Sequence, residues 1–314
     1  MPEWLIERGI GEIRALLVEN GEIVEARITL DGVVRAGTVL EARLKQTTAP
    51  TIAFADGVEY LLPGGAPGVT EGAALRIAVT REAIPGAEPW KRPLARITDE
   101  PQSIAPPLAG REVAFPSPRN ELDDAGWDDL IEQARSSMVA FPGGALRISP
   151  TPAMTLIDVD GTLPAAELAV AGAAAAAKAI RRLDIGGSIG IDLPTVAGKT
   201  PRQAAAAAID AHLPQPFERT AVNGFGFGQI VRPRSRASLL EIWTDQASAE
   251  ARTLLRRAAL AGSGPKRLAA HPLVTAILEA NPGWLDALAR QLGGAVSLRA
   301  DPALHISAGH AEPA

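Results

Sequence analysis

Three aspartates lie where two apolar segments of the sequence end. Asp158 and Asp160 close the segment MTLIDVDG, and Asp192 closes the apolar run of SIGIDLP. In a strand, residues two apart point to the same face, so Asp158 and Asp160 are expected to project together. If the two segments are adjacent parallel strands, the three carboxylates gather at the edge of the sheet where α/β proteins form their sites. Oxygen-only ligands of this kind suit Mg²⁺ or Mn²⁺.

A divalent ion held by such carboxylates activates water and stabilises charge on a phosphodiester. Hydrolysis of a phosphate ester is therefore one chemistry that this edge could carry. The structural alternative is that these aspartates only cap the helices or turns that follow them. That alternative fits Asp192 alone better than it fits the pair Asp158 and Asp160.

The segment IDVDGTL also fits the nucleophile motif of the haloacid-dehalogenase-like phosphatases. In that interpretation Asp158 accepts the phosphoryl group and Asp160 acts as the acid and base. Those enzymes also need a downstream lysine and an acidic pair, and neither DD nor GDxxxD follows position 161. A phosphatase is therefore the less favoured alternative.

Composition excludes several other kinds of site. The 314 residues include no cysteine, which excludes disulfides, thiolate zinc sites, iron–sulfur clusters and a cysteine nucleophile. The histidines number four, so zinc is not expected as a cofactor. The net charge of −5 means that nucleic-acid binding would need local basic patches. The sequence shows neither a signal peptide nor an apolar run of about 18 residues, so we expect a cytoplasmic protein without a membrane partner.

The first hundred residues have the pattern of short strands. Residues 1–35 alternate apolar and polar side chains, and the pair Asn20-Gly21 between two such runs predicts a β-hairpin. Residues 36–98 continue as four or five short strands separated by turns, a spacing that predicts a small β-barrel. Five prolines within 99–120 then indicate a linker or an irregular crossing.

From residue 138 onward, strand-like and helix-like segments alternate, which predicts an α/β region. Apolar periodicity predicts helices over 121–137, 164–183, 201–213, 246–261, 271–278 and 282–292. Strands are expected in SSMVAF, ALRISPT, MTLIDVDG, SIGIDL, the stretch 218–231, AVSLRA and ALHISA.

The order of these segments resembles the catalytic region of the ribonuclease E/G family. FPGGALRISPTPAMTLIDVDG is similar to that family's Pro-Ser-Gly-Gly turn, strand and IDVN segment, and AKAIRRLDIGGSIGIDLP to its second aspartate segment. IAFADGVEYLLPG is similar to its aromatic AFVD…GFLP segment. TPRQAAAAAIDAHL and NGFGFGQIVRPRSR are similar to two of its arginine-containing segments. The chain resembles a short, cysteine-free member that lacks the zinc-link and most of the 5′-sensor region.

The resemblance implies a mixed α+β and α/β fold. An OB-fold β-barrel would be inserted in a ribonuclease H-like part, and a deoxyribonuclease I-like α/β catalytic region would follow. The implied parts are the ribonuclease H-like strands, the OB-fold RNA-binding domain, a linker and helix with a reduced sensor region, the catalytic domain and a small C-terminal domain. Their expected bounds are 1–35, 36–98, 99–137, 138–245 and 246–314. The last part occupies the place of the family's dimerisation region, which allows a homodimer.

The resemblance also implies an endoribonuclease that cleaves single-stranded RNA by a metal-activated water and leaves 5′-phosphates, as in RNA processing or decay. Asp158 and Asp192 would be the Mg²⁺ ligands, and Asp160 would stand where the family has an asparagine that orients the water or the scissile phosphate. Phe54 and Tyr60 would stack on unpaired bases. Phosphate contacts are implied for Lys91, Arg92, Arg219, Arg232, Arg234 and Arg236.

Alternatives stay open for these residues and for the function. Phe54 and Tyr60 can instead belong to the barrel core, and the arginines to a solvated basic turn. A non-catalytic RNA-binding paralogue is the second functional hypothesis, favoured by the alanine-rich helix 164–183, the aspartate at position 160 and the negative net charge. It predicts RNA binding that weakens with salt, without magnesium-dependent cleavage.

Overall fold

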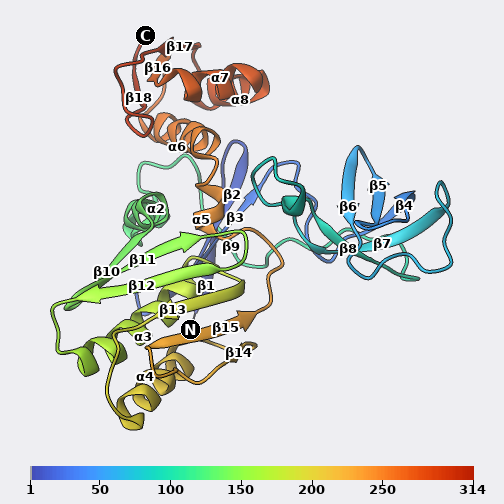
Figure 1. The fold of residues 1–314 in the computed structure, drawn as a ribbon. Helices are drawn as coiled ribbons and strands as arrows, with labels where there is room; N and C mark the ends of the chain where they lie inside the picture. The colour runs from blue at the N-terminus through green and yellow to red at the C-terminus, as the bar shows by residue number, and fades with distance from the viewer. Residues whose placement is uncertain (1) are drawn as a thin grey trace. The chain divides into compact units, whose positions relative to one another are not determined.

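The computed structural model of the chain describes residues 2–314 as a mixed α+β protein (Figure 1). Contacts divide the chain into two compact units, each built from segments that are far apart in the sequence. The first unit contains the chain up to Asp31, Ala109–Ile131 and Ile242–Ala314, and the second contains Gly32–Leu108 and Glu132–Glu241. No helix within residues 2–314 is long and apolar enough to cross a membrane. The second unit holds both the predicted barrel and the three aspartates.

A four-stranded sheet opens the first unit, in the order β3-β2-β1-β9. β1, β2 and β3 run antiparallel, and β9 joins β1 in parallel. The turn between β2 and β3 has positive φ angles at Asn20 (54°) and Gly21 (83°), as a tight hairpin turn requires. The predicted hairpin is therefore confirmed. The strands are β1 (Glu3–Arg8), β2 (Glu12–Glu19), β3 (Glu22–Leu30) and β9 (Arg111–Glu112).

The helix predicted over residues 121–137 is broken in two. α1 (Glu121–Asp124) and α2 (Trp127–Ser136) are separated at Gly126, whose φ of 102° does not fit a helix. α1 begins with a side-chain cap, because Asn120 Oδ1 accepts hydrogen bonds from the backbone N–H groups of Leu122 (2.9 Å) and Asp123 (3.1 Å). Periodicity did not reveal the break because apolar residues on both sides of Gly126 are buried.

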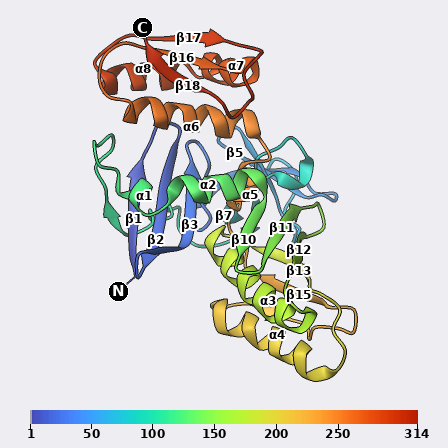
Figure 2. The same cartoon turned by 90° about the vertical axis from the view of Figure 1, so that its left-hand side faces the viewer.

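The last seventy residues form α6 and a small α/β assembly in the first unit (Figure 2). The strand predicted over ALHISA is wrong, because Asp301 Oδ1 accepts from the N–H of Ala303 and His305 bonds Ser307 in local turns. β16 was not predicted, since KRLAA has little β propensity and its place in the centre of the sheet is set by tertiary contacts. The elements are α6 (Gln246–Leu260), β16 (Lys266–Ala270), α7 (Pro272–Ala280), α8 (Pro282–Leu292), β17 (Val296–Ala300) and β18 (His310–Pro313), and the sheet order is β17-β16-β18.

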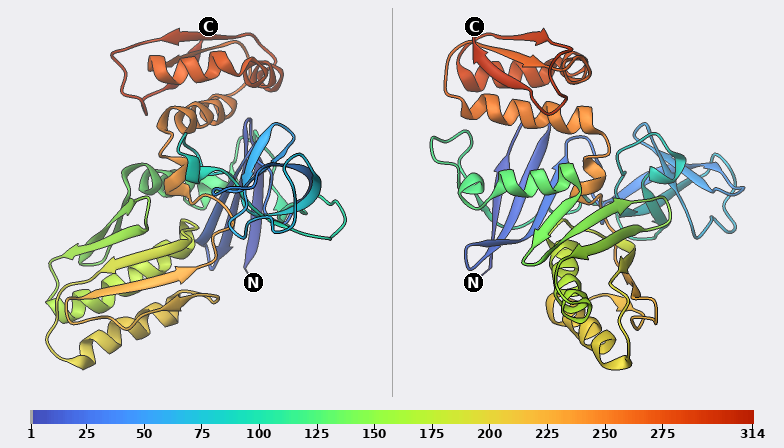
Figure 3. Two further views of the ribbon diagram at one scale, coloured as in Figure 1. Left: turned by 45° about the vertical axis from the view of Figure 1, so that its right-hand side comes forward. Right: turned by 60° about the vertical axis from the view of Figure 1, so that its left-hand side comes forward.

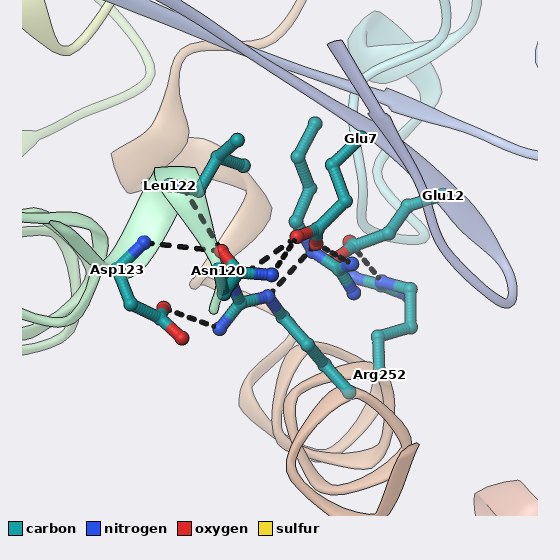
Figure 4. A network of polar contacts seen from close by, with 8 residues as sticks. Glu7, Glu12, Asn120, Leu122, Asp123 and Arg252 are labelled. Carbon is teal, nitrogen blue, oxygen red and sulfur yellow. Dashed lines mark hydrogen bonds and ion pairs between the residues drawn. The ribbon is translucent and has the colours of Figure 1, made fainter. Parts of the chain in front are cut away.

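A buried network of charged side chains joins the first sheet to α6 and α1 (Figure 4). The carboxylate of Glu7 on β1 accepts hydrogen bonds from Arg14 Nη1 (2.8 Å), Arg256 Nε (2.9 Å) and Asn120 Nδ2 (2.7 Å). Burial raises the pKa of Glu7, but hydrogen bonds and charge from Arg256, Arg14 and Asn120 outweigh it and hold that pKa below its ordinary value. Since buried charges persist only when they are paired, the network ties three distant segments of this unit together. Its other members are Glu12, Asp123 and Arg252.

In the second unit, five strands close into a barrel in the order β4-β5-β6-β8-β7. β6 and β8 are parallel, and the other neighbours are antiparallel. The predicted small barrel is therefore confirmed as a closed mixed barrel. The strands are β4 (Val39–Gln46), β5 (Ile52–Ala55), β6 (Val58–Leu61), β7 (Ala74–Arg81) and β8 (Leu94–Ile97), with the 3₁₀ turn η1 (Pro89–Lys91) before β8. Apolar side chains fill the interior, among them Leu44, Ala53, Tyr60, Ile77 and Val79.

The second unit also contains a six-stranded sheet, in the order β10-β11-β12-β13-β15-β14. α3 (Ala165–Arg182) packs on β11 and β12, and α4 (Lys199–His212) packs beside α3 (Figure 1 and Figure 3). Gly172 of α3 permits the close approach, since a Cβ there would lie 2.3 Å from Val159 Cγ1. Both predicted helices are confirmed, and the short α5 (Leu239–Ile242) follows the sheet. The strands are β10 (Met138–Phe141), β11 (Gly144–Pro150), β12 (Thr155–Gly161), β13 (Gly187–Asp192), β14 (Glu218–Arg219) and β15 (Phe227–Arg232).

Candidate active site

The pairing of β12 with β13 brings two of the predicted site residues together, Asp158 from the middle of β12 and Asp192 from the carboxyl end of β13. The strands are parallel, and Asp158 of β12 lies directly opposite Asp192 of β13. The two outer neighbours of these strands extend the same line of residues. Arg147 of β11 is opposite Asp158, and Phe227 of β15 is opposite Asp192. Neighbouring strands lie about 4.8 Å apart, so the four residues form one row across the sheet. The condition set by the sequence, that the two aspartate strands are adjacent and parallel, is met.

This row lies on the open face of the sheet, the face opposite α3. Ile157 and Ile191, which precede the two aspartates, are completely buried, whereas Asp158 and Asp192 are exposed. Because side chains alternate between the faces of a strand, the carboxylates point away from the buried layer. Within residues 2–314, neither carboxylate makes a side-chain hydrogen bond or an ion pair. Like charges directly opposite each other are destabilising, and a bound cation would relieve their repulsion.

Asp160 lies on the same face, one side-chain step further along β12 and opposite Ala145 of β11. It is exposed and stands about 7 Å from Asp158 along the strand. Among residues 2–314, no group of three or more His, Asp or Glu side chains is placed to hold a metal ion. Mg²⁺, however, is commonly bound by one or two carboxylates, with water and substrate phosphate completing its shell. The donor chemistry of Asp158 and Asp192 therefore fits Mg²⁺ or Mn²⁺.

A short loop before β15 holds an exposed aromatic side chain at the end of β13. Asn223 Oδ1 accepts hydrogen bonds from the backbone N–H groups of Phe225 (2.9 Å) and Phe227 (3.1 Å). Gly226 has a φ of 92°, and a Cβ there would lie 2.1 Å from the carbonyl oxygen of Leu193. Only glycine lets the loop approach the end of the strand this closely. The loop presents the side chain of Phe225, which is 82% exposed.

A second phenylalanine lies flat on the open face beside the carboxylates. A Cβ at Gly190 of β13 would lie 2.6 Å from Phe227 Cζ and 3.0 Å from Leu156 Cδ2. The ring of Phe227 therefore covers the space above Gly190, next to the half-exposed side chain of Leu156. Phe227 and Leu156 thus form an apolar platform next to the two carboxylates.

Three residues of this face were missed by the sequence analysis, namely Arg147, Phe225 and Phe227. A signal for Arg147 was present, because it is the charged residue between the buried Leu146 and Ile148, and alternation places it on the exposed face. Its neighbour across the sheet depends on the register between β11 and β12, which a single sequence does not specify.

Arg219, a predicted phosphate contact, lies on the helix side of the sheet. It is opposite the buried Ile230 of β15, and its Nε donates to Asp210 Oδ1 of α4 at 2.7 Å. The hydrogen bond raises the pKa of Arg219 and lowers the pKa of Asp210. With Lys199 and Arg202, this pair lines a groove of about 510 Å³ between α4 and residues 219–222. Arg219 and the carboxylate row are therefore on different faces.

The other three predicted arginines are engaged within the chain. The guanidinium of Arg232 donates to the carbonyls of Ile180 (3.4 Å) and Ile185 (3.2 Å), at and just beyond the end of α3. It thus lies on the helix-covered face, where it satisfies backbone acceptors. Arg236 pairs with Asp184 at 3.0 Å, and Arg234 pairs with Glu241. These interactions do not bring the three arginines to the carboxylate row.

On the barrel, Phe54 and Tyr60 point to opposite sides. Phe54 is 42% exposed on the outer surface of β5. Tyr60 has no exposed surface and lies in the barrel interior, so the prediction that it stacks on a base is wrong. The alternation of β6 turns this side chain inward. Lys91 and Arg92 each form an ion pair of 3.1 Å with a nearby glutamate.

Comparison with known proteins does not assign the chain to a family. No protein-family model matches it, and no curated protein matches it. The similarity to the ribonuclease E/G family therefore depends on the sequence segments quoted above. The candidate function depends on the geometry of the open face.

Proposed function

We propose that the chain is a magnesium-dependent endoribonuclease that cleaves single-stranded RNA, with Asp158 and Asp192 as the metal ligands. The observation that carries the proposal is the pair of in-register carboxylates without partners on the open face of a sheet. The aromatic side chains beside the pair support it, because Phe225 and Phe227 offer flat surfaces on which unpaired bases stack. Base stacking tolerates any sequence and favours single strands.

The proposed reaction is hydrolysis of a phosphodiester. Asp158 and Asp192 would hold Mg²⁺, which when bound lowers the pKa of a water molecule and stabilises negative charge on the phosphate. The water oxygen would form a bond to phosphorus and give up a proton to solvent while the P–O3′ bond breaks. The 3′ oxygen would take up a proton from solvent, so that the products are a 5′-phosphate and a 3′-hydroxyl. Asp160, exposed on the same face, would accept a hydrogen bond from the attacking water at its carboxylate oxygen.

We further propose that the barrel is an OB-fold that binds RNA. The strand order β4-β5-β6-β8-β7, with β6 and β8 parallel, supports this assignment. The outer surface carries Phe54 with Arg43 directly opposite it, a ring and a cation that suit single-stranded RNA. From the sequence resemblance alone, the sheet β3-β2-β1-β9 is proposed to be ribonuclease H-like and the six-stranded sheet deoxyribonuclease I-like.

The test is cleavage of a labelled, unstructured RNA oligonucleotide in Mg²⁺ and in EDTA. Wild type is compared with Asp158→Asn and Asp192→Asn, which keep the size of each side chain and remove its charge. Asp286→Asn is the matched control, since Asp286 is exposed on α8 in the other unit. Loss of an outer-shell partner already costs 10–100-fold at metal sites, so losing a ligand should lower the rate by about 100-fold or more.

Each outcome of this test decides between the hypotheses. Magnesium-dependent cleavage that disappears in both site variants and persists in Asp286→Asn supports the proposal. Full activity in either site variant contradicts the proposal that Asp158 and Asp192 bind the metal ion. RNA binding without any cleavage by wild type supports the non-catalytic paralogue. Turnover of a small phosphomonoester, with phosphate bound covalently to Asp158, supports the phosphatase alternative.

A further inference from the structure

Arg147 occupies an unusual position on the open face. It lies in the middle of β11, it is exposed, and its cross-strand partner is Asp158. Within residues 2–314, its guanidinium makes neither a hydrogen bond nor an ion pair. Arg219 and Arg236, by contrast, both pair with an aspartate close by. Arg147 is thus a cation that lies opposite Asp158 in the row but is paired with neither of its carboxylates.

The fold fixes Arg147 on this face. Leu146 and Ile148 on either side of it are 0% and 1% exposed, and they belong to the core beneath the sheet. A slip of one residue would bury the guanidinium and expose both apolar side chains, so the register is strongly specified. The position opposite Asp158 is therefore a fixed feature of the strand pairing.

We propose that Arg147 is a further catalytic residue, which binds the non-bridging oxygens of the scissile phosphate. This inference rests on the proposed function and names the group that receives the phosphate. A guanidinium presents several N–H donors in a planar fork that matches two phosphate oxygens. A phosphate held over Asp158 lies one strand away, about 4.8 Å, from the backbone of Arg147, well within reach of its side chain. Arg147 thereby stabilises the charge that grows on these oxygens as the water attacks.

The competing explanation is that Arg147 only balances the charge of the carboxylates. The two explanations differ in what happens when the arginine is removed. If it only balances charge, its removal strengthens Mg²⁺ binding and leaves RNA binding without Mg²⁺ unchanged. If it binds phosphate, its removal weakens RNA binding even without metal and reduces its dependence on salt.

The experiment uses the full chain with Arg147→Ala and Arg147→Lys. Arg267→Ala is the matched control, because Arg267 is an exposed arginine on a strand of the other unit and has no partner within residues 2–314. Binding of a fluorescent RNA oligonucleotide is measured in EDTA over a range of salt concentrations. Cleavage is measured at varied RNA and Mg²⁺ concentrations, and circular dichroism checks that each variant is folded.

We expect Arg147→Ala to lower kcat by about 100- to 1,000-fold, as for loss of one donor to a developing oxyanion. The slope of log affinity against log salt should fall by about 0.7, the value for one phosphate contact on a single strand. Arg147→Lys should keep the salt slope but not the full kcat, since it retains the charge and loses the planar fork. Arg267→Ala should match wild type.

Wild-type cleavage by Arg147→Ala would overturn the proposal. If Arg147→Ala had an unchanged salt slope and bound Mg²⁺ more tightly, the proposal would also be overturned. Arg147 would then only balance the charge of the carboxylates. If wild type binds RNA but does not cleave it, the proposed function and the catalytic role of Arg147 both fail. The salt slope then still decides whether Arg147 contacts phosphate, so the two failures are distinguishable.

Discussion

Replacing Glu7 by glutamine tests whether the buried network of Figure 4 holds the first unit together. Glu7→Gln keeps the size of the side chain but removes the negative charge between Arg14 and Arg256, whose side chains are 1% and 4% exposed. Each arginine keeps a second carboxylate, Glu12 for Arg14 and Asp123 for Arg256. Removing one partner of a buried pair costs 3–5 kcal/mol, and the remaining pairs put the expected loss at the lower end, about 3 kcal/mol.

Urea unfolding measures this loss. Trp127 is buried with its ring 5.8 Å from the guanidinium of Arg256, so its fluorescence responds when the network opens. With a slope of about 1–3 kcal/mol per molar urea, a loss of about 3 kcal/mol lowers the midpoint by about 1–3 M. This is a large fraction of the 5–15 kcal/mol that stabilises a typical domain. The slope itself should stay constant, because the fold is the same.

The pH dependence of the effect has a definite sign. The network holds the pKa of Glu7 below its ordinary value of 4.5. A carboxylate of this kind stabilises the folded state above its ordinary pKa, and the contribution is lost as the pH falls through the lowered pKa. The difference between wild type and Glu7→Gln should therefore be constant near neutral pH and shrink below about pH 4.

Glu112→Gln is the control, because Glu112 forms an exposed pair with Arg8 in the same sheet. Its urea midpoint should equal that of wild type, since exposed pairs contribute little. An equal midpoint for Glu7→Gln would refute the reasoning about the network. If the stability difference between wild type and Glu7→Gln stayed constant below about pH 4, the charge of Glu7 would not be the cause of the effect.

Three further predictions concern the surfaces around the site. Gly190→Ala should raise KM for RNA, because its Cβ would lie 2.6 Å from Phe227 Cζ and displace the ring from the platform; steady-state cleavage measures this. Phe225→Ala should weaken RNA binding by about 1–3 kcal/mol if a base stacks there, with an unchanged melting temperature because the ring is 82% exposed. Replacing Lys199 and Arg202 together by alanine should lower the salt slope of RNA binding by about 1.4 if the groove beside α4 contacts two phosphates, and an unchanged slope would exclude the groove from the RNA path.

The parts of the fold that local sequence signals determine were predictable. The Asn20-Gly21 turn, the barrel and the long helices follow from turn chemistry and periodicity. The wrong or missing predictions concern elements whose secondary structure depends on contacts with the rest of the fold. The helix break at Gly126 is masked by buried apolar residues on both sides, and β16 is a strand because it is paired on both of its edges.

The candidate site shows the same division. The aspartates were found because alternation and strand ends are local properties of the sequence. Tyr60 was misassigned because a strand too short for a clear alternation does not reveal which side of a barrel a ring faces. Arg147 and Phe227 were missed because their relation to the aspartates is a cross-strand register, which connects residues far apart in the chain.

The charges of the open face explain why these residues belong together. Three carboxylates and the guanidinium of Arg147 leave two negative charges on one side of the sheet. Such a face attracts cations, and divalent cations most strongly. Under the proposed function, a divalent cation on Asp158 and Asp192 would balance the remaining charge. Arg147, which no carboxylate has paired with, would then stay available to the phosphate. The proposed metal site and the unpaired arginine thus belong to one arrangement of charges on this face.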